Sequence, residues 1–300
     1  MLIKDQLSKN TTFSFEFFPP RTVESSSELY KTIKALKILE PSFVSITYGA
    51  GGATRDLTHD LVVKLAGENE FTVASHLTCV GSTKTELENI LRRYRDNGIC
   101  NIMVLRGDPV NFSEGFVPLE DGFSNASELV AFTKQLYPDM GIGVAAYPEG
   151  HPETPDRLKE MEYLKRKVDE GADYICTQMF FDNHDFYDFR ERCEIAGINI
   201  PIIAGIMPVT SITMMRRMSS LALGTHIPGK LLRALLRAQD KDYFEKVGIH
   251  WATEQVRDLI DNRVNGVHFY TLNKSRATLK IYDNLGVTSS SGLSDDKNFV

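Results

Sequence analysis

The chain has 300 residues, of which 42% are hydrophobic, so it can form one large α/β domain or two small ones. Its formal net charge of −6 and its scattered Lys and Arg residues argue against a nucleic acid or an anionic membrane as partner. The four cysteines show no CxxC or CxxH spacing, and no apolar stretch resembles a signal peptide or a membrane span. We therefore expect a cytoplasmic protein with no disulfide framework.

The first predicted element is a short buried strand over residues 12–18, within the sequence FSFEFFPPRT at 13–22. Phe favours strands, and Pro19 and Pro20 end the segment. Glu16 therefore stands near the end of an apolar strand, where burial favours the protonated acid. Such an acid can donate a proton to a substrate, although an ion pair with Arg21 is the alternative interpretation.

Apolar, β-branched runs then alternate with amphipathic stretches along the chain. Strands are predicted at 12–18, 43–48, 72–78, 101–106, 142–147, 174–179, 200–206 and 267–271. Helices are predicted near 23–39, 55–67, 83–97, 125–136, 156–170, 184–196, 210–220 and 274–285, with two more within 228–263. Continuous hydrophobicity within the strands indicates a parallel sheet that is covered on both faces.

This order predicts an α/β fold, a (β/α)8 TIM barrel with extra helices before the last strand. A barrel of this kind has about 250 residues, which fits a single domain over 1–287. A doubly wound open sheet is the alternative, but Gly49, Gly51 and Gly52 do not have the spacing of a dinucleotide fingerprint. The Ser- and Asp-rich residues 288–300 are predicted to form a disordered tail.

Polar and aromatic residues stand at the predicted C-terminal ends of the strands, where barrel enzymes place their active sites. They are Glu16, Thr47, Tyr48, His76, Arg106, Gly107, Asp108, Tyr147, His151, Gln178 and Tyr270. A convergent polar set of this kind predicts a functional site. His76 and His151 have no third ligand at metal spacing, so we predict no metal site.

With these residues in place, the chain resembles the methylenetetrahydrofolate reductase family in its short bacterial form, from about residue 12 to 287. The motifs are FSFEFFPPRT (13–22), VSITYGAGG (44–52), SHLTC (75–79), LRGDP (105–109), VAAYPEGHPE (144–153), LKRKVDEGAD (164–173), TQMFFD (177–182) and HFYTLN (268–273). The resemblance implies an FAD-binding barrel that reduces 5,10-methylenetetrahydrofolate to 5-methyltetrahydrofolate. It also implies electrons from NAD(P)H, a ping-pong mechanism and a role in methionine synthesis.

The same resemblance implies roles for individual residues. Glu16 would be the acid that opens the folate ring, and Asp108 would stabilise the resulting cation. Gln178, Tyr270 and Lys274 would bind substrate together with Asp108. The residues implied around FAD are Thr47, Tyr48, Ala50, His76, Arg106, Gly107, Asp108, Ala126, Tyr147, His151, Glu160, Arg166 and Lys167. Asn125, Tyr163 and Lys274 depart from the family pattern, at the positions implied for the FAD adenine and the folate tail.

The resemblance further implies a homo-oligomer, and the short form would lack inhibition by S-adenosylmethionine. It leaves NADH and NADPH open, with NADH usual for short bacterial members. Two other interpretations remain at this stage. One is a flavin barrel with another substrate, as in proline dehydrogenases, which need no ring-opening acid. The other is a folate- or flavin-binding subunit of a larger complex.

Overall fold

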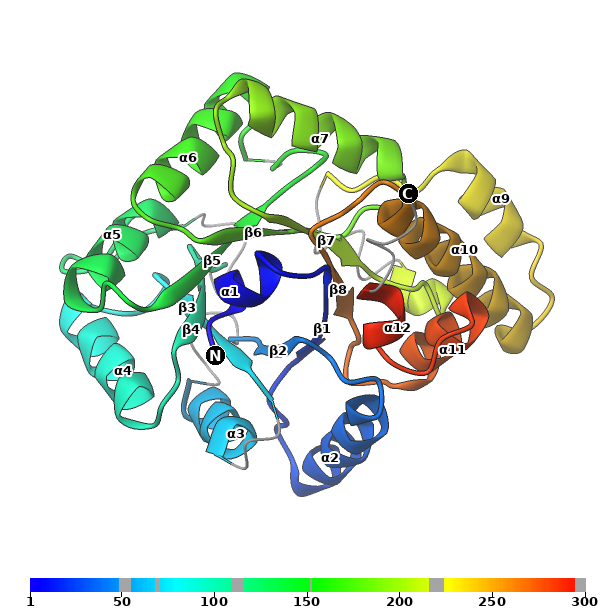
Figure 1. The fold of residues 1–300 in the computed structure, drawn as a ribbon, viewed down its shortest axis with the longest axis horizontal. Helices are drawn as coiled ribbons and strands as arrows, with labels where there is room; N and C mark the ends of the chain where they lie inside the picture. The colour runs from blue at the N-terminus through cyan, green and yellow to red at the C-terminus, as the bar shows by residue number, and fades with distance from the viewer. Residues whose placement is uncertain (49–54, 68–70, 109–115, 152, 216–223, 295–300) are drawn as a thin grey trace.

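The computed structural model describes residues 1–48, 55–67, 71–108, 116–151, 153–215 and 224–294. Parallel strands close into a barrel in sequence order, and Figure 1 looks along it. The strands are β1 (Thr12–Phe17), β2 (Phe43–Ile46), β3 (Val73–Thr78), β4 (Asn101–Leu105), β5 (Gly141–Ala146), β6 (Tyr174–Thr177), β7 (Ile202–Ile206) and β8 (Gly266–Tyr270). The predicted TIM barrel is confirmed.

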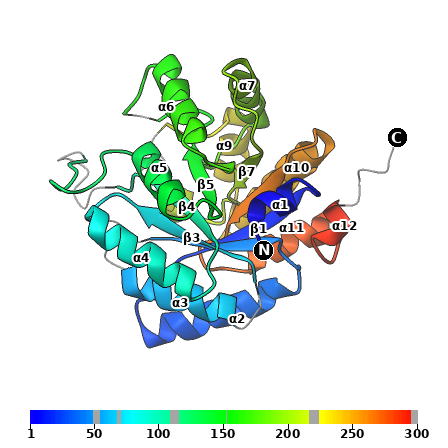
Figure 2. The ribbon, with the colours of Figure 1, turned by 60° about the vertical axis from the view of Figure 1, so that its left-hand side comes forward.

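Helices form an outer ring around the strands (Figures 1 and 2). They are α2 (Val23–Lys37), α3 (Arg55–Gly67), α4 (Lys84–Asp96), α5 (Ala126–Leu136), α6 (Arg157–Asp169), α7 (Asn183–Ile195), α9 (Gly229–Leu236), α10 (Lys241–Asp261) and α11 (Arg276–Leu285). Helices α9 and α10 are the extra helices expected before the last strand. In the part of the chain that is described, no helix is long and apolar enough to cross a membrane.

A short helix that the sequence analysis did not predict, α1 (Ile3–Leu7), lies over one mouth of the barrel (Figure 1). Ile3 and Leu7 are buried in the same apolar cluster as Phe43 and Tyr174. The backbone N–H of Ile3 also donates a hydrogen bond of 2.9 Å to Oδ1 of Asn101, the first residue of β4. Helix α1 therefore closes the N-terminal end of the barrel and leaves the opposite end for a site.

Residues 288–294 differ from the predicted disordered tail. They include the helix α12 (Ser291–Ser294), in which Leu293 is buried. The Ser290 hydroxyl donates a hydrogen bond of 2.8 Å to the carbonyl oxygen of Leu39 and lies 2.9 Å from the Tyr282 hydroxyl. These contacts give the segment buried partners that its polar composition did not reveal. Residues 295–300 lie outside the described residues.

Gly248 allows α10 to pack closely against the end of β7. A Cβ atom at this position would lie 1.8 Å from the carbonyl oxygen of Val209. We expect Gly248→Ala to lower the free energy of unfolding by about 1–3 kcal/mol or more, because the helix must move away. Urea unfolding measures the change. Gly67→Ala is the matched control, since its added Cβ meets nothing within 4 Å, and an equal effect of both substitutions would contradict this packing argument.

Candidate active site

The open end of the barrel carries the predicted acid. Glu16 on β1 is aligned with Ser45 of β2 on one side and with Tyr270 of β8 on the other. Residues aligned across parallel strands point to the same side of the sheet, so these side chains share one surface. The hydroxyl of Thr271 donates a hydrogen bond of 2.6 Å to the Glu16 carbonyl oxygen and fixes the end of β1 against β8.

The Glu16 carboxyl group lies between two imidazole rings. Its Oε2 atom is 3.6 Å from Nε2 of His76 and 3.7 Å from Nε2 of His268, and the side chain is only 18% exposed. Burial lowers the pKa of His76, and the Glu16 charge opposes this effect. Within the described residues no Lys or Arg is paired with Glu16, and Arg21 is exposed. The alternative of an ion pair with Arg21 is therefore wrong.

His268 was missed by the sequence analysis. Its ring is 2% exposed, lies between the Ser14 and Ser45 hydroxyl groups, and stacks on Phe43. The available signal was the period of two along β8, which places His268 and Tyr270 on the same face. A buried histidine on that face belongs inside the barrel, next to the predicted acid.

The end of β4 brings together three predicted residues. Arg106 binds Oε2 of Glu153 at 2.6 Å and lies over the Phe116 ring. Gly107 has a φ of 84°, and a Cβ atom there would lie 2.5 Å from Val80 Cγ1, so glycine is required at this turn. Asp108 follows it and is exposed.

The loop after β5 and helix α6 together hold four more predicted residues. The Tyr147 and His151 rings meet edge to face at 4.7 Å, and the backbone N–H of His151 donates to Glu160 Oε1 at 2.8 Å. Burial raises the pKa of Tyr147 to about 12, and the nearby Asp108 charge adds to this shift. Lys167 donates a hydrogen bond of 2.5 Å to the Ala145 carbonyl oxygen, and burial lowers its pKa to about 8. Tyr147 therefore lies near Asp108, and α6 adds a partly buried cation.

The other predicted residues lie around this centre. Thr47 and Tyr48 follow β2, and Gln178 follows β6, where its Oε1 accepts the Met179 N–H at 2.9 Å. Lys274 is exposed in the loop after β8.

Two further residues lie on the helices. Ala126 begins α5 behind its cap Asn125, whose side chain accepts the Glu128 N–H. Arg166 is exposed on α6 and lies over the Tyr163 ring, whereas its neighbour Lys167 is partly buried. Ala50 lies outside the described residues.

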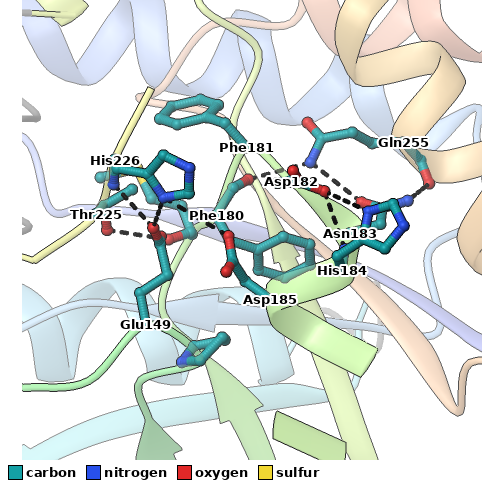
Figure 3. Close-up of polar contacts among 12 residues, drawn as sticks. Glu149, Phe180, Phe181, Asp182, Asn183, His184, Asp185, Thr225, His226 and Gln255 are labelled. Atoms are coloured by element: carbon teal, nitrogen blue, oxygen red, sulfur yellow. Dashed lines mark hydrogen bonds and ion pairs between the residues drawn. The ribbon is translucent and has the colours of Figure 1, made fainter. Parts of the chain in front are cut away.

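A separate ionic cluster joins two loops and helix α7 near this end of the barrel (Figure 3). His226 donates to Oε1 of Glu149 through both its backbone N–H and its Nδ1 atom, and Nδ1 lies 3.7 Å from Asp185 Oδ2. The Thr225 hydroxyl donates to the Met179 carbonyl oxygen at 3.3 Å. The cluster was not predicted, because its members are far apart in sequence. It attaches residues 224–228 to the loop after β5 and to α7.

The cluster should make the stability of the protein depend on pH. The hydrogen bond to Glu149 raises the pKa of His226, and burial raises the pKa of Glu149 and of Asp185. Asp182 also faces His226 and favours its charged form. Because the pKa values of His226, Glu149 and Asp185 are all raised, the folded state binds protons more tightly than the unfolded chain. The contribution of the cluster to the stability of the fold therefore decreases as pH rises.

As the pH rises above about 6.5, the usual pKa of histidine, we therefore expect the unfolding temperature of the unmodified protein to fall more steeply than that of His226→Gln. The histidine contribution is complete below this pH and is lost as pH rises through the raised pKa. Calorimetry at a series of pH values measures the difference. His250→Gln, at an exposed position on α10, is the control. Parallel curves for the unmodified protein and His226→Gln would contradict the expectation.

Comparison with known proteins agrees with this arrangement. A family model described as methylenetetrahydrofolate reductase matches residues 2–286. The 5,10-methylenetetrahydrofolate reductase of Escherichia coli is 39% identical over 277 residues, which cover 91% of this chain and 90% of that relative. Methylenetetrahydrofolate reductase (NADH) 1 of Arabidopsis thaliana is also 39% identical, over 295 residues. That match covers 95% of this chain but 50% of the plant protein, so the chain spans about half the length of this relative.

A solved structure supports the fold. It is an uncharacterized protein from Clostridium thermocellum that binds two copies of 5-methyl-5,6,7,8-tetrahydrofolic acid, and it superimposes with a TM-score of 0.67. The two proteins are 15% identical, and the match covers 95% of this chain and 99% of the other. This similarity concerns the fold, whereas the family model and the bacterial relative cover nearly the whole sequence. The chain belongs to the methylenetetrahydrofolate reductase family.

Proposed function

We propose that this protein reduces 5,10-methylenetetrahydrofolate to 5-methyltetrahydrofolate, with FAD as cofactor and NAD(P)H as electron donor. Its membership of the family supports the reaction, and the surroundings of Glu16 carry the proposal. Among the described residues, this partly buried acid lies between two imidazoles and has no Lys or Arg partner. Three plant relatives have NADH in their names, which favours NADH over NADPH.

The substrate needs an acid. Its methylene group bridges two nitrogens, and protonation of one nitrogen opens the ring to a cationic iminium that accepts hydride. Glu16 would supply this proton at the open end of the barrel. Asp108 would place a negative charge near the cation, and the Gln178 amide would bind an edge of the pterin through hydrogen bonds.

The residues around the site fit an anionic dinucleotide such as FAD. Lys167 is partly buried, and its hydrogen bond goes to a neutral carbonyl oxygen. In the described chain it forms no ion pair, although the Glu160 charge favours its protonated form. A pyrophosphate would place a further negative charge beside Lys167, and Arg106, which is paired with Glu153, would supply a second cation. The turn at Gly107 leaves no room for a side chain and lets the backbone approach a ligand closely. A bound flavin supplies hydride transfer, which amino-acid side chains cannot provide.

We propose further that NAD(P)H and the folate use the site in turn, in a ping-pong cycle. We also propose that the protein is a cytoplasmic homo-oligomer and that it provides methyl groups for methionine synthesis. These finer points rest on the family resemblance.

Anaerobic stopped-flow spectroscopy tests the function. Purified protein loaded with FAD is mixed with NADH or NADPH, and then with methylenetetrahydrofolate. Loss of flavin absorbance followed by its recovery with folate is the expected result, and the faster nucleotide identifies the donor. A protein that does not take up FAD, or one that bleaches but is not reoxidised by folate, would overturn the proposal.

A further inference from the structure

Two carboxylates and one imidazole converge beside the proposed active site, in the ionic cluster of Figure 3. Glu149 lies in the loop after β5, Asp185 in the first turn of α7, and His226 in the segment before α9. One possible ligand atom of each residue lies within 4.8 Å of the other two, and His226 Nδ1 is 3.7 Å from Asp185 Oδ2. These three side chains are of the kinds that bind a divalent metal ion.

Protein donors do not satisfy the two carboxylates. The Glu149 side chain is only 9% exposed, and its Oε2 atom is buried with no hydrogen-bond partner among the described residues. Oδ2 of Asp185 is also buried without a hydrogen bond. It is costly to bury a carboxylate oxygen without a donor, so these two oxygens point to a cation between them.

The charges of the cluster also favour a cation. Glu149 and Asp185 each form an ion pair with His226, and in the described part of the chain neither pairs with a Lys or an Arg. Asp182 adds a negative charge near the His226 ring, and Arg157 acts on Asp185 without forming an ion pair with it. One imidazolium therefore faces two paired carboxylates, whose charges a divalent ion would balance.

We propose that Glu149, Asp185 and His226 form a Zn²⁺ site, in which Nδ1 of His226 and one oxygen of each carboxylate bind the ion. An imidazole ligand favours Zn²⁺ over Mg²⁺ and Ca²⁺, which prefer oxygen ligands alone. Zinc binds such atoms at about 2.0–2.2 Å, so ligand atoms in a tetrahedral site lie roughly 3.3–3.6 Å apart. The distance of 3.7 Å between His226 Nδ1 and Asp185 Oδ2 is close to this spacing.

Binding of the ion exchanges one contact for another. His226 Nδ1 now donates its proton to Glu149 Oε1, and zinc would take the place of this proton, which is released to water. The unpartnered Glu149 Oε2 can then serve as the carboxylate ligand. Because the His226 side chain is 58% exposed, water can fill the fourth position. The sequence analysis predicted no metal site, since these three ligands are far apart in sequence.

The site would link three segments of the chain. Glu149 is two residues from both Tyr147 and His151, so the ion would hold the loop that carries these proposed FAD contacts. None of the three ligands is assigned to the proposed reaction, and the site does not depend on it. A test of metal binding needs neither folate nor nucleotide, so its result is separate from that of the proposed function.

Isothermal titration calorimetry of Zn²⁺ into the purified full chain, after removal of metals with EDTA, tests the site. We expect one tight site per chain and a higher unfolding temperature with the ion bound. Loss of an outer partner of a metal ligand weakens binding by roughly 10–100-fold, so loss of a ligand should weaken it at least as much. His226→Gln and Asp185→Asn should each show this loss. Mg²⁺ should bind far more weakly than Zn²⁺.

His184→Gln is the matched control, because this ring is 94% exposed and pairs with Asp182 at the same end of α7. It should leave the tight site unchanged. No tight binding of Zn²⁺, equal binding of Mg²⁺, a site that survives His226→Gln, or one that is lost in His184→Gln would overturn the proposal. Thermal unfolding without metal checks the folding of each variant. If His226→Gln does not fold, Asp185→Asn provides the same test from α7.

Discussion

Replacement of Glu16 by Gln is expected to abolish reduction of the folate while reduction of the bound flavin by NADH proceeds normally. Gln has nearly the shape of Glu, but its amide cannot donate a proton as an acid. Only the folate step needs ring opening by protonation, so only that step should fail. A positioned general acid contributes roughly 10²–10⁴-fold, which sets the size of the expected loss.

Stopped-flow measurement of the two half-reactions separates these effects. The flavin absorbance reports reduction by NADH in the first mixing step and reoxidation by folate in the second. Glu28→Gln is a suitable control, because this residue is on the exposed face of α2, where its side chain is 70% exposed. If Glu16→Gln leaves both half-reactions at their normal rates, Glu16 has a structural role and the proposed mechanism is wrong.

The sequence was sufficient to predict the fold because each strand carries its own signal. Runs such as 102–105 and 202–206 are apolar throughout, which requires cover on both faces and therefore a parallel sheet. Once the barrel was predicted, its geometry placed residues such as Glu16 and Asp108 at the same end. Neither step depends on contacts between distant parts of the chain.

The details that were missed do depend on such contacts. Glu16 and His268 are far apart in sequence, and the register between β1 and β8 brings them together. In the same way, α1 can be recognised only from the barrel mouth that it covers. Helix α12 and the preceding Ser290 can be recognised only from their hydrogen bonds to Thr11 and Leu39. Local patterns predict elements, whereas closure of the barrel decides which side chains meet.

Long-range contacts also decide which cations remain available to a ligand. Arg276 lies two residues after Lys274, and its guanidinium is 3.4 Å from both Asp242 and Glu245. Lys165 and Lys167 are neighbours on α6, yet Lys165 pairs with Asp169 while Lys167 is turned inward to a carbonyl oxygen. A run of basic residues in the sequence therefore contains one side chain that turns inward beside others that stay at the surface.

Asp108→Asn should slow reduction of the folate by about 10²-fold, the usual effect of removing one preorganised electrostatic group. The substitution keeps the shape of the side chain and removes its charge. The Asp108 charge already acts on its surroundings, because it contributes to the raised pKa of Tyr147. A cationic substrate in the same place should be stabilised by that charge, and the variant loses this stabilisation.

Loss of the Asp108 charge should also change the redox potential of the bound flavin, because the reduced flavin carries more negative charge. We expect its midpoint potential to become less negative in Asp108→Asn, which a titration against reference dyes measures directly. Asp96→Asn, at an exposed position on α4, is the matched control and should change neither quantity. The potential and the folate rate report the same charge through different ligands, so they should change together. If both the potential and the rate of folate reduction stay normal, Asp108 does not take part in the chemistry and is only a residue of the loop after β4.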